Sequence, residues 1–409
     1  MTVELPTASV FDIAWPAITY HDAHDPDEAH RLIRQARQRA PIAMGPYGPE
    51  VLSYELVHTV LRDSRFAMPR GIGLAVQGIN SGPVWDKVTK LIANLDGAEH
   101  QRLRRLVARA FTPRAAARMR TACVNVITEL IDAYTAVGHC DVVTDIARPY
   151  PVSIICALLG APREDWHLFT RWADDIGEAF GANVANEERA IVTAWAQLDA
   201  YVEDMIARRR RCRTDDLISE LIRAEDDGEQ LNHDELVDLV ALLLYAGTDT
   251  TRNQLAAAIQ ILSTHPDQWA LLGEHAELAP RAVEELMRYF PIAFSAIRVA
   301  TQDVELGGVL IPAGTFVLAN TAAANRDPSM YDKPDRLDIT RNGAAPMLTF
   351  GGGVHYCLGS HLARLELTEA LCVITKRLAN PRRTGPAPWK AMTGISGPTT
   401  LPIAFEVGQ

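Results

Sequence analysis

Apolar residues recur with a helical spacing through most of the chain. Short segments with alternating polarity are fewer, and Gly307-Gly308 between two of them predicts a hairpin turn. No linker or internal repeat divides the sequence, so we expect a single domain over residues 1–409, mainly α with minor β. The predicted helices are 27–39, 100–111, 114–134, 189–210 and 234–262, and the predicted strands are 51–53, 304–306 and 309–311.

The segment 236–245 is apolar on nearly all sides, a pattern typical of a helix buried in the core of a large protein. It continues into Ala246-Gly247-Thr248-Asp249-Thr250-Thr251 before the apolar pattern resumes. Buried polar groups need partners, so this polar run requires an explanation. Either Gly247 ends one helix and Asp249 or Thr250 caps the next, or one long helix carries a functional groove at this point.

Proline and glycine are concentrated between Ala67 and Pro83. A long irregular stretch inside a compact protein is either disordered or functional. Because apolar residues are interspersed in this stretch, we expect it to form a loop over a pocket.

The bulk composition excludes several classes of protein. A hydrophobic content of 48% with 22% charged residues is ordinary for a globular chain, and a net charge of −11 argues against nucleic-acid binding. No apolar run approaches the roughly 20 residues that span a bilayer, and the first residues lack the basic start of a signal peptide. Six scattered cysteines are typical of reduced thiols. We therefore expect a cytoplasmic monomer without a membrane anchor.

The richest stretch of the sequence is Phe350-Gly351-Gly352-Gly353-Val354-His355-Tyr356-Cys357-Leu358-Gly359, which leads into a predicted helix. The N–H groups at the start of a helix and its dipole both favour a thiolate at Cys357. Gly353 and Gly359 leave room for a large planar group. Alternatively, Cys357 is a buried structural thiol. A zinc site lacks ligands, because no second cysteine or histidine cluster lies nearby.

The spacing Phe-x-x-Gly-x-x-x-Cys-x-Gly, followed by Leu362-Ala363-Arg364, resembles the haem-binding loop of the cytochrome P-450 superfamily. The resemblance implies a soluble, bacterial-type monooxygenase with a long central helix over a buried haem b. Cys357 would be the axial ligand, O2 the co-substrate, and Phe350, Gly351 and Gly359 part of the haem site. A thiolate ligand favours cleavage of the O–O bond.

Other segments resemble further motifs of that superfamily, in the expected order. Ala246 to Thr251 resembles the oxygen-activation motif, which implies that Asp249 and Thr250 deliver protons and that Gly247 leaves room for dioxygen over the haem. Ala246 and Gly247 would both be part of the haem site. Glu285-x-x-Arg288 and the later Pro334-Asp335-Arg336-Leu337 resemble a structural ion network. The resemblance also assigns contact with the haem propionates to His100, Arg104, Arg298 and His355.

The helix that begins at His100 carries Arg102, Arg105 and Arg109 on a third face, away from both the apolar residues and Arg104. These arginines form either an ordinary solvated face or a docking patch for an acidic ferredoxin. No Gly-x-Gly-x-x-Gly dinucleotide motif follows a strand, so we expect electrons to come from a separate ferredoxin and ferredoxin reductase.

The expected reaction inserts one oxygen atom of O2 into a lipophilic small molecule, with hydroxylation as the expected form. A peroxide-driven enzyme and a non-catalytic haem or ligand sensor are the alternatives, since neither needs Asp249 and Thr250. The segments that border the pocket in this superfamily are mostly apolar here, which suits such a substrate. The expected pocket residues are Leu74, Val76, Ile79, Trp85, Leu243, Ala246, Ile292, Phe294 and Ile395.

Overall fold

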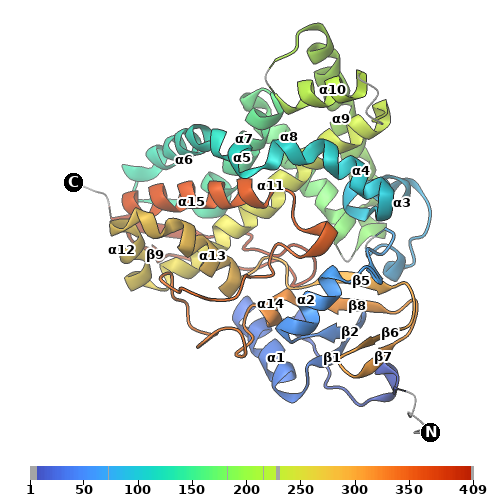
Figure 1. Ribbon diagram of the computed structural model, residues 1–409. Helices are drawn as coiled ribbons and strands as arrows, with labels where there is room; N and C mark the ends of the chain where they lie inside the picture. The colour runs from blue at the N-terminus through green and yellow to red at the C-terminus, as the bar shows by residue number, and fades with distance from the viewer. Residues whose placement is uncertain (1–6, 72, 182, 215, 227–230, 407–409) are drawn as a thin grey trace, which may run out of the picture.

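The computed structural model describes residues 7–71, 73–181, 183–214, 216–226 and 231–406, and its main elements are helices (Figure 1). The α-helices are α1 (Pro26–Arg39), α2 (Tyr54–Arg62), α3 (Pro83–Val88), α4 (Gly97–Ala108), α5 (Pro113–Arg118), α6 (Arg120–Thr135), α7 (Pro149–Leu159), α8 (Trp166–Gly177), α9 (Val184–Arg211), α10 (Leu217–Asp226), α11 (His233–Ser263), α12 (Pro266–Glu274), α13 (Ala279–Tyr289), α14 (Thr321–Ala324) and α15 (Ser360–Arg377). This composition confirms the predicted mainly α class.

Three small sheets accompany the helices. Their strands are β1 (Ile42–Gly45), β2 (Gly48–Val51), β3 (Phe66–Ala67), β4 (His139–Asp141), β5 (Ala296–Ala300), β6 (Val304–Leu306), β7 (Val309–Ile311), β8 (Phe316–Ala319), β9 (Ala379–Arg383) and β10 (Pro402–Glu406). The largest sheet has the order β1-β2-β8-β5-β3, in which only β2 and β8 run parallel. It lies beside α1, α2 and α14, at the side of the helical body (Figure 1). The second sheet has the order β4-β10-β9, and β6 pairs with β7.

Helix α11 is a single, uninterrupted helix of 31 residues. Asn232 and Glu235 form a capping box at its start, which satisfies two backbone N–H groups there. Inside the helix, the Thr248 hydroxyl donates to the Leu244 carbonyl at 2.7 Å, and the Thr250 hydroxyl donates to Ala246 at 3.1 Å. Because the helix runs without a break from His233 to Ser263, the interpretation in which it ends at Gly247 is wrong.

Most of the other predicted elements are confirmed, with two corrections. The predicted helix over 114–134 is two helices, α5 and α6, which meet at Met119. The predicted strand over 51–53 includes only Val51, because the Ser53 hydroxyl accepts a hydrogen bond from Leu56 and caps α2. The predicted hairpin is present, with φ of 60° at Gly307 and 81° at Gly308, a conformation that favours glycine.

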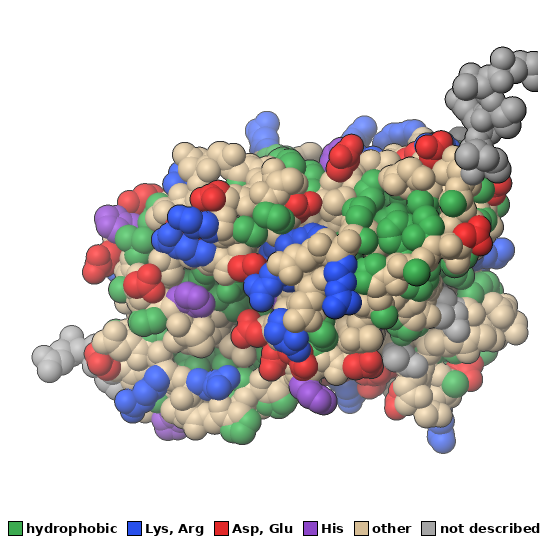
Figure 2. Space-filling view, turned by 90° about the horizontal axis from the view of Figure 1, so that it is seen from below, with side chains coloured by type: hydrophobic (Ala, Val, Ile, Leu, Met, Phe, Trp, Pro, Cys, Tyr) green, Lys and Arg blue, Asp and Glu red, His purple; other side chains and the backbone are tan. Residues whose placement is uncertain are grey.

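The main core surrounds α11, which packs against α7, α8, α9 and α15. Within the described residues, the stretch Val142–Leu159 is long and apolar enough to cross a membrane by composition. It is 67% buried inside the protein, because α7 packs on both α6 and α11. This stretch is therefore accounted for as part of the core. On the face seen from below, basic side chains near the centre have acidic ones around them (Figure 2).

Candidate active site

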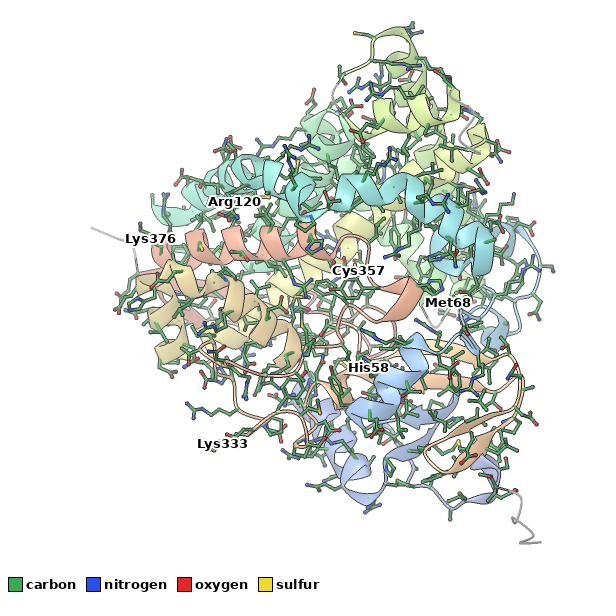
Figure 3. The ribbon with its side chains drawn as sticks, viewed as in Figure 1. His58, Met68, Arg120, Lys333, Cys357 and Lys376 are labelled. Carbon is green, nitrogen blue, oxygen red and sulfur yellow. The ribbon has the colours of Figure 1, made fainter. Side chains whose placement is uncertain are left out.

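A cavity of about 390 Å³ lies between α11, the start of α15, α4 and the loop that carries Cys357. Its lining is mostly apolar, and Cys357 is the one cysteine among the described residues that line it. Figure 3 shows Cys357 near the centre of the molecule, on the segment that leads into α15, with Met68, another residue of the lining, to one side. The structure thus places the cysteine loop and the polar run of α11 on the same cavity.

Short backbone contacts hold the cysteine loop in shape. The Cys357 N–H donates to the Phe350 carbonyl at 2.9 Å and closes the loop. Gly353 has a φ of +64°, and a Cβ there would lie 2.6 Å from the Leu61 carbonyl oxygen, so this glycine lets the loop pack on α2. A Cβ on Gly359 would meet nothing within 4 Å. The space expected for a planar group therefore exists at Gly359, whereas at Gly353 that expectation was wrong.

The Cys357 thiol is accessible from the cavity, yet protein surrounds it on its other sides. Burial raises the pKa of this thiol, while the backbone N–H of Gly359 and the charges of Arg104 and Arg364 act in the opposite direction. The start of the helix therefore favours the thiolate as predicted, but burial outweighs it in the protein alone. A bound metal ion removes the proton of a coordinating thiol outright.

One wall of the cavity carries cationic and polar groups suited to carboxylates. His100 is 2% exposed, and its Nδ1 has no hydrogen-bond partner among the described protein atoms. Burial, followed by the neighbouring His355 and Arg104, lowers the pKa of His100 to about 4. Arg104 lines the cavity and donates to the Tyr356 carbonyl. Arg298 is buried outside the lining and donates to the Ile297 carbonyl at 2.8 Å, so the structure does not bring this predicted propionate ligand to the cavity surface. Burial lowers the pKa of both arginines, which a carboxylate partner would offset.

His355 lies beside His100, with their ring centroids 4.4 Å apart. Its Nε2 donates to the Asp96 carboxylate at 2.7 Å, and the Met68 N–H donates to the same carboxylate at 2.6 Å. Asp96 precedes α4 and was not predicted as a site residue. An acidic residue just before a glycine that starts the His100 helix was the available sequence signal.

The residues of α11 divide between the cavity and a charged cluster. Ala246, Gly247 and Thr250 line the cavity as predicted. However, a Cβ on Gly247 would lie 2.9 Å from Cγ1 of Ile155, so the space beside this glycine is already filled by α7. The absence of a side chain at Gly247 allows α11 and α7 to pack closely. The expectation that this absence leaves open room for dioxygen was therefore wrong.

Asp249 points away from the cavity lining and is 6% exposed. Its carboxylate lies 2.6 Å from Nη2 of Arg252 and 3.7 Å from Nζ of Lys390. Arg252 also contacts Asp174 at 2.6 Å, and the side chain of Asp174 is 34% exposed. A chain of charged groups therefore leads from the protein surface to Asp249, one residue before Thr250.

The ion network around Glu285 differs from the prediction in one member. Arg288 donates to both carboxylate oxygens of Glu285, at 2.7 and 2.9 Å, and both residues are buried. The second cation on Glu285 is Arg341, whose Nε lies 3.0 Å from Oε2. The predicted pairing with Arg336 was wrong, because this side chain is exposed and only its backbone carbonyl accepts from Arg288, at 3.4 Å.

The predicted arginine patch on α4 is smaller than expected. Arg105 and Arg109 are exposed. Arg102 is instead half-buried against α11, where it forms an ion pair with the Glu235 carboxylate. Arg102 thus reaches Glu235 near the start of α11, which removes it from the predicted patch.

The predicted pocket residues divide into two groups. Leu243, Ala246, Ile292 and Ile395 line the cavity. Leu74 is buried in the main core, and Ile79 and Trp85 pack against that core without lining the cavity. Phe294 lies in a separate cluster, with its ring centroid 5.6 Å from that of Tyr20. The side chain of Val76 lies outside the described part of the structure.

The sequence reasoning missed several polar residues of the described lining. They include Thr251 and Gln254 on α11, Glu366 on α15, and Thr349 before the cysteine loop. Glu366 and Gln254 each lie within a helical pattern where a polar residue at a buried position is the available signal. Met68 and Tyr356 also line the cavity, and nothing in their local pattern distinguishes them.

Comparisons with known proteins agree with this geometry. The family model of cytochrome P450 matches residues 50–278 and 272–379. The luteothin monooxygenase of Streptomyces thioluteus is 37% identical over 408 residues, covering 98% of this chain and 99% of that protein. The mycinamicin IV hydroxylase/epoxidase of Micromonospora griseorubida is 38% identical over 400 residues, covering 95% and 98%.

Solved structures lead to the same conclusion. The crystal structure of CalO2 superposes with a TM-score of 0.88 at 33% identity, covering 96% of this chain and all of that chain (100%). The cysteine loop fits the haem of this family, and the lining residues His100, Arg104 and His355 fit its carboxylates. The chain therefore belongs to the cytochrome P450 family and is a haem-thiolate monooxygenase.

Proposed function

We propose that this enzyme hydroxylates a lipophilic small molecule in the cavity between α11 and the Cys357 loop. The observation that carries the proposal is a cysteine facing a largely apolar cavity that His100, Arg104 and His355 also line. When bound, haem b with a thiolate ligand reduces dioxygen with two electrons and two protons, so that one oxygen atom enters the substrate and the other leaves as water. Leu243, Ile292 and Ile395 would contact the substrate by apolar packing.

Most of the residues that would hold the haem line the cavity, whereas Gly351 and Arg298 lie outside its lining. Cys357 would supply the thiolate ligand, with Phe350, Gly351 and Gly359 shaping the loop against the cofactor. The orphaned Nδ1 of His100 and the guanidinium groups of Arg104 and Arg298 would bind the propionates, because a buried carboxylate needs such partners. His355, fixed by Asp96, would complete this wall.

Proton supply would use the two residues that follow Thr248. The Thr250 hydroxyl faces the cavity, and its bond to the Ala246 carbonyl fixes its rotamer. Asp249 would pass protons from solvent, because Arg252 and Asp174 connect it to the surface. A non-catalytic haem sensor would need neither Asp249 nor Thr250. The presence of both residues therefore favours an enzyme driven by electrons over a sensor.

Electrons would come from a separate ferredoxin and its reductase. Arg105 is exposed on α4, and Arg109 is exposed directly after that helix. Because His100 and Arg104 of α4 line the cavity, an acidic ferredoxin docking there would lie close to the haem. Arg102 is left out of this surface because it pairs with Glu235. We also propose that residues 1–409 act as one domain in a cytoplasmic monomer.

The decisive experiment replaces Cys357 with Ala. Wild-type protein should show the thiolate-type spectrum of the reduced carbon monoxide complex, and the variant should lose it. Cys372→Ala is the matched control, because this thiol lies in α15, the helix that follows Cys357, and is partly buried but does not line the cavity. Retention of the spectrum by Cys357→Ala would refute the assignment. Product formation with peroxide alone would identify the peroxide-driven alternative.

A further inference from the structure

A second cavity, which we call the α5–α7–α10 cavity, is bordered by residues of these three helices and lies apart from the active site. Its volume is about 190 Å³, which is below the roughly 300 Å³ at which pockets for drug-sized ligands begin. Part of its lining is apolar, from small side chains such as Ala115 and from Leu217, and part is charged. The cavity therefore suits a molecule about the size of a free amino acid.

Two charged side chains at the α5–α7–α10 cavity lack protein partners. Arg118 lies in the last turn of α5 and Glu220 in the first turn of α10, and both are exposed. Neither side chain forms an ion pair or a hydrogen bond with any residue that the structure describes. Asp216, by contrast, accepts from the Ser219 N–H at 2.8 Å and pairs with Arg209. The cavity thus offers one free cation and one free anion among its described lining residues.

The distribution of charge describes a ligand that carries both signs. The planar guanidinium of Arg118 is suited to a carboxylate, which it can bind through two parallel N–H groups. Glu220 is suited to an ammonium group. Ala157 and Leu158 of the lining belong to the last turn of α7, whose end carries partial negative charge and also favours a cation. A free α-amino acid with an aliphatic side chain has the carboxylate, the ammonium and an alkyl group for Leu217.

The α5–α7–α10 cavity and the active-site cavity share parts of their walls. Ile155 of α7 lines the active-site cavity, whereas Ala157 lies about 200° around the same helix and lines the other one. After α4, Ala110 lines the α5–α7–α10 cavity and Phe111 lines the active-site cavity. Ile155 also packs closely on α11, since a Cβ on Gly247 would lie 2.9 Å from its Cγ1. Because packed interiors transmit displacements, a ligand that fixes α7 also fixes a wall of the active site.

We propose that the α5–α7–α10 cavity binds a free aliphatic α-amino acid, and that the bound amino acid raises the affinity of the active-site cavity for its own ligand. Arg118 holds the carboxylate, Glu220 holds the ammonium group, and the alkyl group packs on Leu217. With α7 already held in place, a ligand of the active-site cavity loses less conformational entropy on binding. The amino-acid site is independent of the proposed monooxygenase function, and only its effect on the active-site cavity rests on that function.

The first test measures binding of L-leucine to the haem-loaded enzyme by saturation-transfer NMR. Wild-type protein should give a saturable signal from the leucine methyl groups, and Ala157→Trp, which fills the cavity from an exposed position, should abolish it. Arg118→Ala and Glu220→Ala should each weaken binding about fivefold, the effect of one exposed ion pair. Arg114→Ala is the matched control, because Arg114 is exposed on α5 but does not line the cavity. No saturable signal from wild type, or equal affinity in every variant, would overturn the proposal.

Two analogues of leucine assign the charges. Leucinamide lacks the carboxylate, so Arg118→Ala should bind it at least as tightly as wild type does. The compound 4-methylpentanoate lacks the ammonium group, so Glu220→Ala should bind it at least as tightly as wild type does. If Arg118→Ala lost as much affinity for leucinamide as for leucine, Arg118 would not be the carboxylate ligand and the assignment would be refuted.

The last test measures the effect on the active-site cavity. The probe is 4-phenylimidazole, an azole that binds haem iron, and its affinity is read from the haem spectrum with and without saturating L-leucine. Leucine should raise this affinity about fivefold in wild type and leave it unchanged in Ala157→Trp. Ile155→Ala should still bind leucine but lose the effect. An unchanged affinity in leucine-bound wild type would refute the coupling. Failure of the proposed function would be distinguishable, since wild-type protein would then lack the thiolate-type spectrum while leucine binding persisted.

Discussion

Removing Arg288 should destabilise the protein far more than removing Arg336, although both arginines belong to the motifs of one ion network. The Arg288 guanidinium contacts both oxygens of Glu285 and also donates to the carbonyls of Asn325 and Pro334, at 2.8 and 2.9 Å. Arg288→Ala leaves a buried carboxylate and two buried carbonyls short of a donor. The expected loss in the free energy of unfolding is therefore about 3–5 kcal/mol.

Arg341 and Arg336 make a matched pair for this prediction. Arg341→Ala removes one hydrogen bond to Glu285 but leaves Arg288 in place, so the expected loss is about 1–3 kcal/mol. Arg336→Ala keeps the backbone carbonyl that Arg288 contacts and should change stability by less than about 0.5 kcal/mol.

Urea unfolding followed by tryptophan fluorescence and by haem release would rank the three variants. The expected order of loss is Arg288, then Arg341, then Arg336. A loss at Arg336→Ala equal to that at Arg341→Ala would refute the assignment of Arg341 as the second cation. A midpoint for Arg288→Ala that matches wild type would show that the pair with Glu285 contributes no net stability.

Two further predictions concern charge. Glu50 is fully buried, and burial raises its pKa from 4.5 to about 7. Between these two pH values Glu50 is ionised in the unfolded chain but still protonated in the folded protein. The free energy of unfolding should therefore fall as pH rises through this window and then level off. Glu50→Gln should abolish that fall. Relative to wild type, the free energy of unfolding of the variant should rise by about 3 kcal/mol between pH 4.5 and pH 8, as measured by urea unfolding. Parallel pH dependences for the two proteins would contradict this prediction. Charge reversal at Arg105 and Arg109 should slow the first electron transfer from reduced ferredoxin at low salt about tenfold, with the difference vanishing at high salt. Rates equal to wild type at low salt would place the docking surface elsewhere.

The sequence predicted the elements that carry a strong local pattern. The periodicity of α11 and the spacing around Cys357 are local, so both were placed correctly and on one cavity. Pairings between distant segments were harder, because Arg336 and Arg341 are both arginines of one loop and only the packed fold decides which one reaches Glu285. In the same way, Phe294 has the pattern of a pocket residue, but its ring packs against Tyr20, which is far away in the sequence.

Buried polar groups marked the other limit of prediction. Asp96 and Glu366 are ordinary in sequence, and their positions acquire meaning only when His355 and Thr251 lie against them. The prediction for Gly247 shows a related limit: a missing side chain was interpreted as open space, whereas Ile155 of another helix fills that space.

The active-site cavity is lined both by helices of the core and by connecting segments. Thr250 belongs to α11, Glu366 to α15, and Cys357 to the loop that leads into α15. A change in these segments would disturb the core, because α11 and α15 pack against each other. Ala293 and Ile395 also line the cavity, but they lie on connecting segments, between α13 and β5 and between β9 and β10. Connecting segments tolerate exchange better than the elements they join. An engineer could therefore alter which compound is oxidised by swapping short loops between relatives, while the apparatus that carries out the oxidation stays as it is.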